Sequence, residues 1–366
     1  MAPEAPVSLM EKSEETALAL RQLYAAYGYT PYKMSKFEPY DLYAQNRSFV
    51  TGDHILTFTD TDGRLMALKP DVTLSVIKHY RGGQQKICYH ENVYRDTGAS
   101  HEFREIPQAG LECIGEIDLY TQLEVLSLAA ESLRRISDRA ILDLASVSWI
   151  SGLLAASGAD HAAEKRLMRL LHEKNAHGIR ALCEESDLPQ DASAVWQALA
   201  ALYGPAQALL PRLKALCLNE EMEAAHAALS SLCGMLDDHP GVEVNLDFSI
   251  LSDLKYYNGL VFKGYVPGVH AGILSGGQYG NLVKRLGKQA GAIGFAVYLD
   301  MLSQLPAAQR PLDADVLLLY GEKASPLAVA KKARALREQG LRVRVQKEEG
   351  EGRYGRIIRM EGGEEA

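Results

Sequence analysis

Residues 86–96, KICYHENVYRD, and residues 101–115, HEFREIPQAGLECIG, alternate between apolar and polar side chains, and a short polar loop joins them. This pattern predicts two long antiparallel strands. Since strand side chains alternate between faces, Arg104, Gln108 and Glu112 should share one face with Ile106, and Gly110 leaves open space between the last two polar groups. The polar side chains should line a half-buried pocket. A solvent-facing side of an edge sheet is the alternative.

Outward from these strands, the chain divides into β-rich pieces around a helical block. HILTFTDTDGRLMALKPD, residues 54–71, predicts a hairpin that turns at Asp62 and Gly63. Residues 117–144 have a helical pattern, and residues 149–240 are rich in Ala and Leu between Gly and Pro breakers. Alternation returns in residues 242–266. After a linker, residues 313–346 predict a strand, a helix that begins at Ser325 and Pro326, and a second strand.

Composition excludes several classes of protein. The 366 residues are 47% hydrophobic and 23% charged, with a net charge of −8, which is typical of a folded globular protein and gives no overall positive field for nucleic acid. The five cysteines form no C-x-x-C pair, which indicates reduced thiols. The N-terminus carries acids in place of an export signal, and no apolar stretch reaches the roughly 20 residues of a membrane helix. We therefore expect a cytoplasmic protein.

Most local catalytic signatures are missing. The sequence contains no phosphate-binding G-x-x-x-x-G-K-[ST], no dinucleotide-binding G-x-G-x-x-G, no H-E-x-x-H and no G-x-S-x-G. His172 and His177 are five residues apart, which does not place both on one face of a helix. We expect no metal and no bound cofactor.

Five segments taken in order carry a wider resemblance. They are LKPDVT (68–73), VYRD with FREIPQAGLECIG (93–115), DLKYYNGLVFKGY (253–265), SGGQYGNLVKRLG (275–287) and AIGFAVYLD (292–300). Together they resemble the catalytic domain of the class II histidyl-tRNA synthetase family, with a helical insertion in the expected place.

The resemblance implies an α+β fold, with a mixed, mostly antiparallel sheet flanked by helices. Residues 1–145 and 241–306 would form this synthetase-like core, and residues 146–240 the helical insertion. Residues 311–366 would be a truncated α/β remnant of an anticodon-binding domain. The family forms homodimers through the core. The short, weakly charged tail makes tRNA an improbable partner.

The nucleotide-binding side of the family pattern is altered. Ser252 stands where the synthetases have an arginine at the reacting carboxylate, Lys255 replaces an aspartate, and Met301 replaces an ATP-clamping arginine. Glu102 lies near the usual position of another arginine, while Gln278 and Gly280 replace the Arg and Asp of G-G-R-Y-D. Loss of such cations typically lowers the rate of a reaction by about 100-fold or more.

The amino-acid side of the pattern is kept. By resemblance, the following residues would bind histidine: Asp71, Thr73, Arg95, Gln108, Glu112, Tyr256 and Tyr257. Asp71 and Thr73 match the pair at the α-amino group, Gln108 the group at the amino-acid backbone, and Arg95 the arginine of the second family motif. Glu112 matches the carboxylate that reads the imidazole, with the two tyrosines as its walls. Alternatively, Asp71 caps the following helix and Tyr256 only packs.

Two kinds of protein have this pattern. One charges tRNA with histidine, and the other is a non-catalytic regulatory subunit that assembles with the short form of ATP phosphoribosyltransferase in the first step of histidine biosynthesis. A pocket that keeps histidine contacts and loses ATP contacts favours the second. We expect a subunit that the short catalytic subunit needs for activity, with L-histidine as feedback effector. The alternatives are a divergent histidine-tRNA ligase, and a sensor of histidine or RNA for another partner.

Overall fold

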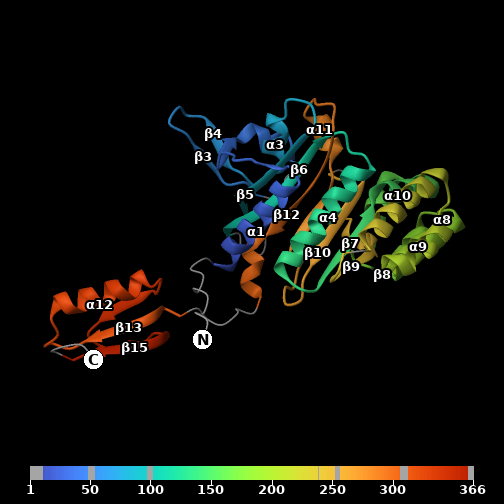
Figure 1. Ribbon diagram of the computed structural model, residues 1–366. Helices are drawn as coiled ribbons and strands as arrows, with labels where there is room; N and C mark the ends of the chain where they lie inside the picture. Colours follow the sequence, from blue (N-terminus) through green and yellow to red (C-terminus); the bar gives the residue numbers. More distant parts are fainter. Residues whose placement is uncertain are drawn as a thin grey trace. The chain divides into compact units, whose positions relative to one another are not determined.

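The computed structural model describes residues 11–47, 54–96, 102–237, 239–251, 256–305 and 312–361 (Figure 1). The chain divides into a larger unit, Lys12–Leu305, and a smaller unit that follows Leu305. Each unit is described by itself.

A nine-stranded sheet forms the centre of the larger unit, in the order β1-β5-β6-β12-β11-β10-β7-β9-β8. All neighbouring strands are antiparallel except β1 with β5 and β7 with β9. The expected mixed, mostly antiparallel sheet is therefore confirmed. Its strands are β1 (Thr30–Pro31), β5 (Gln85–Asp96), β6 (Phe103–Gly115), β7 (Ala140–Ser146), β8 (Tyr203–Pro205), β9 (Val242–Asp247), β10 (Leu260–Tyr265), β11 (Leu274–Gln278) and β12 (Gly291–Tyr298).

Alternate residues of strand β6 face opposite sides of the sheet, the apolar ones towards the main core. Ala109, Leu111 and Cys113 pack in the main core with helices α1 (Lys12–Ala26) and α4 (Leu119–Ile136), which lie along one face (Figure 1). The alternate residues Gln108 and Glu112 point to the opposite face. The predicted pairing of β5 with β6 is confirmed, and Ile87 lies opposite Glu112.

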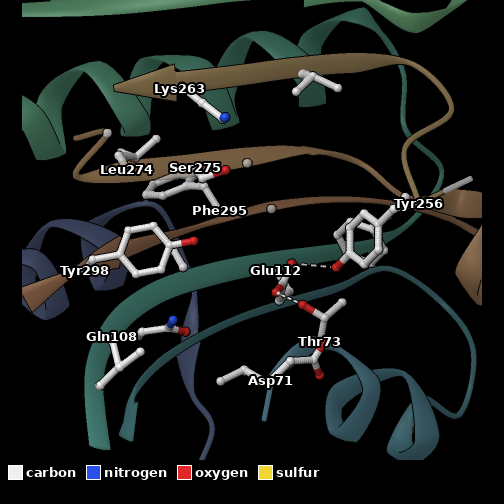
Figure 2. A pocket seen from close by; sticks show the side chains of 18 of the residues that line it. Asp71, Thr73, Gln108, Glu112, Tyr256, Lys263, Leu274, Ser275, Phe295 and Tyr298 are labelled. Carbon is white, nitrogen blue, oxygen red and sulfur yellow. Dashed lines mark hydrogen bonds between the residues drawn. The ribbon is translucent and has the colours of Figure 1, made fainter. Parts of the chain in front are cut away.

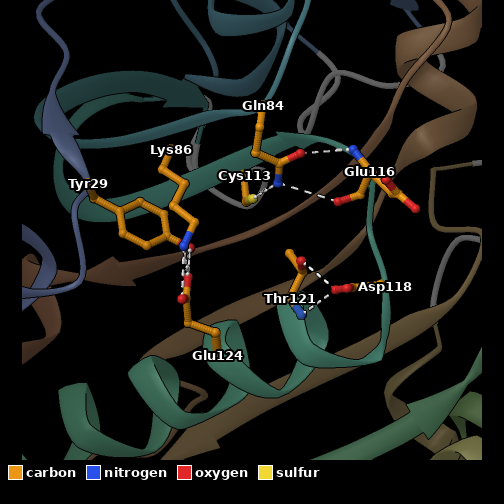
Figure 3. A network of polar contacts seen from close by, with 8 residues as sticks. All are labelled: Tyr29, Gln84, Lys86, Cys113, Glu116, Asp118, Thr121 and Glu124. Carbon is orange, nitrogen blue, oxygen red and sulfur yellow. Dashed lines mark hydrogen bonds and ion pairs between the residues drawn. The ribbon is translucent and has the colours of Figure 1, made fainter.

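Polar contacts fix α4 against this sheet (Figure 3). Asp118 caps the helix by accepting hydrogen bonds from the backbone N–H and the hydroxyl of Thr121, both at 2.7 Å. One turn later Lys86 of β5 donates to both carboxylate oxygens of Glu124, at 2.7 and 2.8 Å. The hydroxyl of Tyr29 also donates to Glu124. This largely buried ion pair satisfies a carboxylate that would otherwise be costly to bury.

The segment between β7 and β9 is mostly helical. Its helices are α5 (Val147–Ser157), α6 (His161–His172), α7 (Ala176–Glu185), α8 (Gln190–Ala200), α9 (Ala206–Ala215) and α10 (Glu220–Leu236). The short strand β8 lies within the same segment and pairs with β9, so the expectation of an entirely helical stretch is wrong there.

The predicted helical pattern over residues 117–144 is also wrong beyond Ile136. Strand β7 begins at Ala140, and six of its seven residues are buried, so residues of both faces are covered. A short apolar run such as AILDLA looks the same in a buried strand and in a buried helix.

A smaller sheet stands beside the main one. Strands β2 (Phe37–Pro39), β4 (Leu65–Leu68) and β3 (Thr57–Thr59) form it in that order, and the hairpin predicted around Asp62 and Gly63 is confirmed. Helix α2 (Tyr40–Ala44) follows β2, and α3 (Thr73–His79) follows β4. Helix α11 (Gly280–Arg285) connects β11 with β12. Short 3₁₀ helices span Phe248–Ile250 and Leu299–Gln304.

The smaller unit contains three parallel strands in the order β14-β13-β15 and one helix. The elements are β13 (Ala314–Tyr320), α12 (Pro326–Glu338), β14 (Val343–Gln346) and β15 (Tyr354–Met360). The predicted strand-helix-strand order is confirmed up to β14. Strand β15 was not predicted, because YGRIIRM is short, contains two arginines and shows no regular alternation of apolar and polar residues.

No helix in the described ranges is both long and apolar enough to cross a membrane. The five cysteines, all of which lie in those ranges, are free thiols.

Candidate functional site

A cavity of about 640 Å³ lies on the face of the main sheet opposite α1 and α4 (Figure 2). Its residues come from β5, β6, β10, β11 and β12, from the start of α3, and from the segment that leads into β10. Such a volume lies within the roughly 300–1,000 Å³ of small-molecule sites. Tyrosines and carboxylates line it beside aliphatic side chains.

All seven residues predicted to bind histidine line this cavity. They are Asp71, Thr73, Arg95, Gln108, Glu112, Tyr256 and Tyr257. The chain therefore brings together groups from three separate stretches of sequence, and each stretch is held by a different element.

Small residues make the floor of the cavity. Gly277 of β11 lies opposite Gly294 of β12, and Ser275 lies opposite Ala296. A Cβ atom on Gly294 would lie 1.8 Å from the Oε2 atom of Glu112, and one on Gly277 would lie 2.6 Å from the ring of Tyr257. The glycines thus give Glu112 and Tyr257 the space that their side chains occupy.

Glu112 is the most enclosed acid of the site, with 2% of its surface exposed. Its Oε2 atom accepts a hydrogen bond from the hydroxyl of Tyr279 at 2.5 Å, and its Oε1 atom accepts one from Thr73 at 3.1 Å (Figure 2). Burial raises the pKa of Glu112 to about 8, although both hydrogen bonds act against this rise. The carboxyl is thus largely protonated at neutral pH in the free protein, and a cationic or N–H-bearing ligand would favour its ionised form.

Asp71 has two roles in the structure. Its Oδ1 atom accepts a hydrogen bond from the backbone N–H of Leu74 at 3.0 Å, so it caps α3. It also lines the cavity. Burial raises its pKa to about 6, and the Leu74 N–H and the nearby Arg95 act in the opposite direction. The helix-capping alternative and the ligand-binding hypothesis are therefore compatible.

Three tyrosines form one wall beside Glu112. The rings of Tyr256 and Tyr257 meet edge to face with 4.6 Å between their centroids, and Tyr256 lies 6.1 Å from Tyr279. Burial, with Glu112 as a further cause, raises the pKa of Tyr279 well above its usual value, so its hydroxyl is a donor at every physiological pH. An aromatic wall with a buried acid at its end suits a flat ring that carries N–H groups.

Gln108 lies on β6, four residues before Glu112 on the same face, and Arg95 lies near the end of β5; both line the same cavity as the tyrosines. Gln108 is 2% exposed, and its Nε2 atom has no hydrogen-bond partner within the part of the chain that the structure describes. Arg95 donates from Nε to the backbone carbonyl of Pro70 at 2.7 Å, which ties it to the loop before Asp71. Gln108 is thus an unused donor that faces the cavity.

The positions that differ from the synthetase pattern are distributed unevenly. Met301 lines the cavity, next to Asp300. Gln278 instead accepts a hydrogen bond from the N–H of Leu260, and so it fixes the start of β10. Glu102 is exposed and does not line the cavity. Ser252 and Lys255 lie outside the described residues.

Sequence reasoning missed two important cavity residues, Tyr279 and Lys263. Tyr279 lies in SGGQYG, between Gln278 and Gly280, the two positions that differ from the family pattern. Lys263 lies two residues after Val261 on β10, so strand alternation alone places both on the cavity face. That signal was available in the sequence.

Comparison with known proteins gives a consistent result. The family model described as "Histidyl-tRNA synthetase" matches residues 7–302. The ATP phosphoribosyltransferase regulatory subunit of Desulfitobacterium hafniense is 32% identical over 304 residues, which are 80% of this chain and 77% of that protein.

Two solved structures share the fold. The ATP phosphoribosyltransferase regulatory subunit/histidyl-tRNA synthetase of Bacillus halodurans has a TM-score of 0.79 at 22% identity, over 100% of both chains. A chain of the ATP phosphoribosyl transferase (HisG:HisZ) complex of Thermotoga maritima has a TM-score of 0.63 at 20% identity, over 79% of this chain and 98% of that one. At these identities the two likenesses show the fold alone, which is that of class II synthetases.

Proposed function

The chain belongs to the histidyl-tRNA synthetase family, on the side of its ATP phosphoribosyltransferase regulatory subunits, and we propose that it is the histidine-binding, non-catalytic subunit of such an enzyme. In this proposal the short catalytic subunit requires it for activity, and histidine in the cavity causes feedback inhibition. One observation carries the proposal: the groups suited to an amino acid are assembled around Glu112, whereas the groups that would hold ATP are replaced.

The groups around Glu112 are complementary to histidine. An imidazole ring between Tyr256, Tyr257 and Tyr279 would place an N–H against the Glu112 carboxylate. Because both oxygens of Glu112 already accept hydrogen bonds, the carboxylate is held in one orientation before any ligand arrives. The α-amino group would lie at Asp71, the second buried carboxylate of the cavity. Charge-assisted hydrogen bonds of this kind are stronger than neutral ones.

The cavity offers few positive charges for the phosphates of ATP. Arg95 and Lys263 are the cations among the described residues that line the cavity, and Arg95 already donates to Pro70. Arg104 of β6, which was expected on this face, does not line the cavity but lies near Asp300. Met301 offers no charge, and Asp300 beside it would repel a phosphate. ATP carries its charge on three phosphates, and catalysis of its reaction depends on positioned cations. This lining therefore supports binding without activation chemistry.

We extend the proposal to the partners and the compartment. The larger unit would form a homodimer, as the synthetase resemblance implies, and the dimer would bind the catalytic subunit in the cytoplasm. Light scattering of the purified chain, alone and with the catalytic subunit, tests both contacts. A monomer at micromolar concentration would contradict the dimer, and separate elution of the two proteins would contradict the complex.

The decisive experiment measures formation of phosphoribosyl-ATP by the short catalytic subunit from the same organism. The assay is run with and without this protein, and histidine is then titrated in. We expect stimulation by the protein and its reversal by histidine. No stimulation at any ratio would overturn the proposal. Histidine-dependent ATP–pyrophosphate exchange by this chain alone would instead support the histidine-tRNA ligase.

Two variants test the cavity within the complex. Glu112→Ala and Tyr257→Ala should weaken inhibition by histidine without dissociating the complex, because both side chains line the cavity of the larger unit. Glu116→Ala, at an exposed position just after β6, is the matched control and should behave as the unmodified protein. Unchanged inhibition in both cavity variants would contradict the site. Because coupling is reciprocal, bound substrates of the catalytic subunit should also change histidine affinity.

A further inference from the structure

The cavity extends well beyond the part that a single histidine would occupy. Lys263 of β10, Ser275 of β11 and Ala296 of β12 form one row across the sheet that ends at Gly110 of β6. Glu112 belongs to the neighbouring row, two residues further along β6 and opposite Gly294. In Figure 2 Lys263 and Ser275 lie on the side of the cavity away from Glu112, and Tyr298 lies to one side, near Gln108.

Backbone spacing gives the scale of this separation. Lys263 and Glu112 are three strands apart, and neighbouring strands lie about 4.8 Å from each other. The offset of two residues along the strand adds about 7 Å in the perpendicular direction, so the two Cα atoms are about 16 Å apart. One residue of extended chain spans only about 3.6 Å, so a single amino acid, even with its side chain extended, is shorter than this separation. A histidine held at Glu112, Thr73 and Asp71 therefore leaves the Lys263 end of the cavity open.

The Lys263 end is richer in donors than the Glu112 end, although Asp300, two residues after Tyr298, also lines the cavity. It contains the ammonium of Lys263, the hydroxyls of Ser275 and Tyr298, and the Nε2 amide group of Gln108. Gln108 Nε2 is buried and, among the described residues, has no hydrogen-bond partner. An unpaired buried donor costs roughly 1–3 kcal/mol. These groups have in common that each can donate to an oxygen atom.

Lys263 is the charged member of this group. Within the described ranges its ammonium makes no hydrogen bond and no ion pair, although Asp143 lies opposite it on β7 and Asp247 lies near. Burial lowers the pKa of Lys263, and the two aspartates act against this without offsetting it. The Oδ1 atom of Asp143 also has no hydrogen-bond partner among the described residues. Because the two aspartates do not offset the cost of burying this cation, an anion that enters the cavity would stabilise it further.

We propose that the Lys263 end of the cavity is a second ligand subsite, in which Lys263, Ser275 and Tyr298 bind the oxyanion of a small molecule while the Glu112 end binds an amino acid. The shared chemistry is a compact oxyanion, a carboxylate or a phosphate monoester. The subsite goes beyond the proposed function, because it requires no catalytic partner. The cavity would then bind two ligands, an amino acid at one end and an anionic metabolite at the other.

The test is calorimetric titration of the full chain with three probes, inorganic phosphate, acetate and adenosine 5′-monophosphate, at constant ionic strength set by chloride. Each titration is run with and without saturating histidine. We expect at least one probe to bind with a stoichiometry of one per chain, and Lys263→Met to weaken that binding at least tenfold. Phosphate and acetate distinguish the two sources of the oxyanion. Lys284→Met, at an exposed lysine of α11 that does not line the cavity, should leave it unchanged.

Three results would overturn the subsite: no binding of any probe, equal binding by Lys263→Met and the unmodified chain, or full competition between the probe and histidine. Histidine affinity of Lys263→Met provides the check on folding, since it should stay within about twofold of the unmodified value. Binding of the oxyanion without binding of histidine would instead contradict the proposed function and leave the subsite intact. The two proposals therefore fail separately.

Discussion

The two ends of the cavity lie on the same sheet but differ in how their polar side chains are satisfied. At one end Glu112 is buried but already accepts hydrogen bonds from Tyr279 and Thr73. At the other end Lys263 and Gln108 are donors without partners among the described residues. At the Glu112 end, hydrogen bonds between side chains hold the polar groups in place. At the Lys263 end, the positions of the polar groups depend only on the strands to which they belong.

This difference predicts where substitutions have large effects. The Glu112 end depends on close packing over glycines and on a buried hydrogen-bond network, so a small change there disturbs both stability and binding. The Lys263 end has no network to lose, so changes there should affect binding alone. Four substitutions test this contrast.

Gly294→Ala should have the largest effect. The new Cβ atom would lie 1.8 Å from Glu112 Oε2 and 2.4 Å from the backbone oxygen of Leu111, so Glu112 or the strand must move. We expect the free energy of unfolding to fall by about 3 kcal/mol and histidine affinity to fall at least 100-fold. Chemical denaturation and calorimetry measure the two effects. Gly234→Ala in α10, where no atom lies within 4 Å, is the control and should stabilise the chain slightly. Equal behaviour of the two variants would contradict the packing argument.

Glu112→Gln should change the pH dependence of stability. The pKa of Glu112 is raised from 4.5 to about 8, so the folded chain binds more protons than the unfolded chain between these values. Stability from this group is present below about pH 4.5 and is lost as pH rises towards 8, with a slope of up to about 1.4 kcal/mol per pH unit. The variant should lack this loss and be more stable than the unmodified chain at pH 8. Denaturation at several pH values measures it, and parallel profiles would contradict the buried neutral carboxyl.

Thr73→Val should have an intermediate effect on histidine affinity. It removes the hydrogen bond to Glu112 Oε1, which is worth roughly 1 kcal/mol, and so should raise the pKa of Glu112 further and weaken histidine binding about five- to tenfold. Thr73→Ser keeps the hydroxyl and should retain most of the affinity. If the serine variant binds as weakly as the valine variant, the hydroxyl is not what matters.

Lys263→Met should have the smallest effect on stability. The side chain has no ion pair to lose among the described residues, and burial disfavours its charge, so the free energy of unfolding should change by less than about 1 kcal/mol, towards greater stability. A loss of several kcal/mol would show that Lys263 supports the fold through Asp143 and Asp247, and the contrast between the two ends would fail.

Much of this architecture could be predicted from the sequence. The β5–β6 pair, the Asp62–Gly63 hairpin and the start of α12 have local signals that need no tertiary information. Strand β7 could not be separated from the end of α4, because burial on both faces removes the alternation that marks a strand. Strand β15 contains two arginines and is partly exposed, and its pairing with β13 defines it as a strand.

The candidate site shows the same division. Gln108 and Glu112 follow from alternation on a single strand, and the resemblance supplied Asp71, Thr73 and the tyrosine pair. What the sequence could not show is the hydrogen bond from Tyr279 to Glu112, which joins residues 167 positions apart. The raised pKa of Glu112 could not be foreseen either, since it depends on how completely the surrounding elements exclude water.

The position of β7 in the sheet also has a kinetic consequence. Both neighbours of β7 in the sheet, β9 and β10, follow it in the chain only after the whole helical block, so that Leu144 must find Phe262 across all of α5–α10. The helical block is built from local contacts and can form early, whereas pairings of such long sequence separation form slowly. During synthesis β7 is therefore exposed as an apolar strand until its partners have left the ribosome. We expect β7 to be a segment with a high risk of aggregation during this interval.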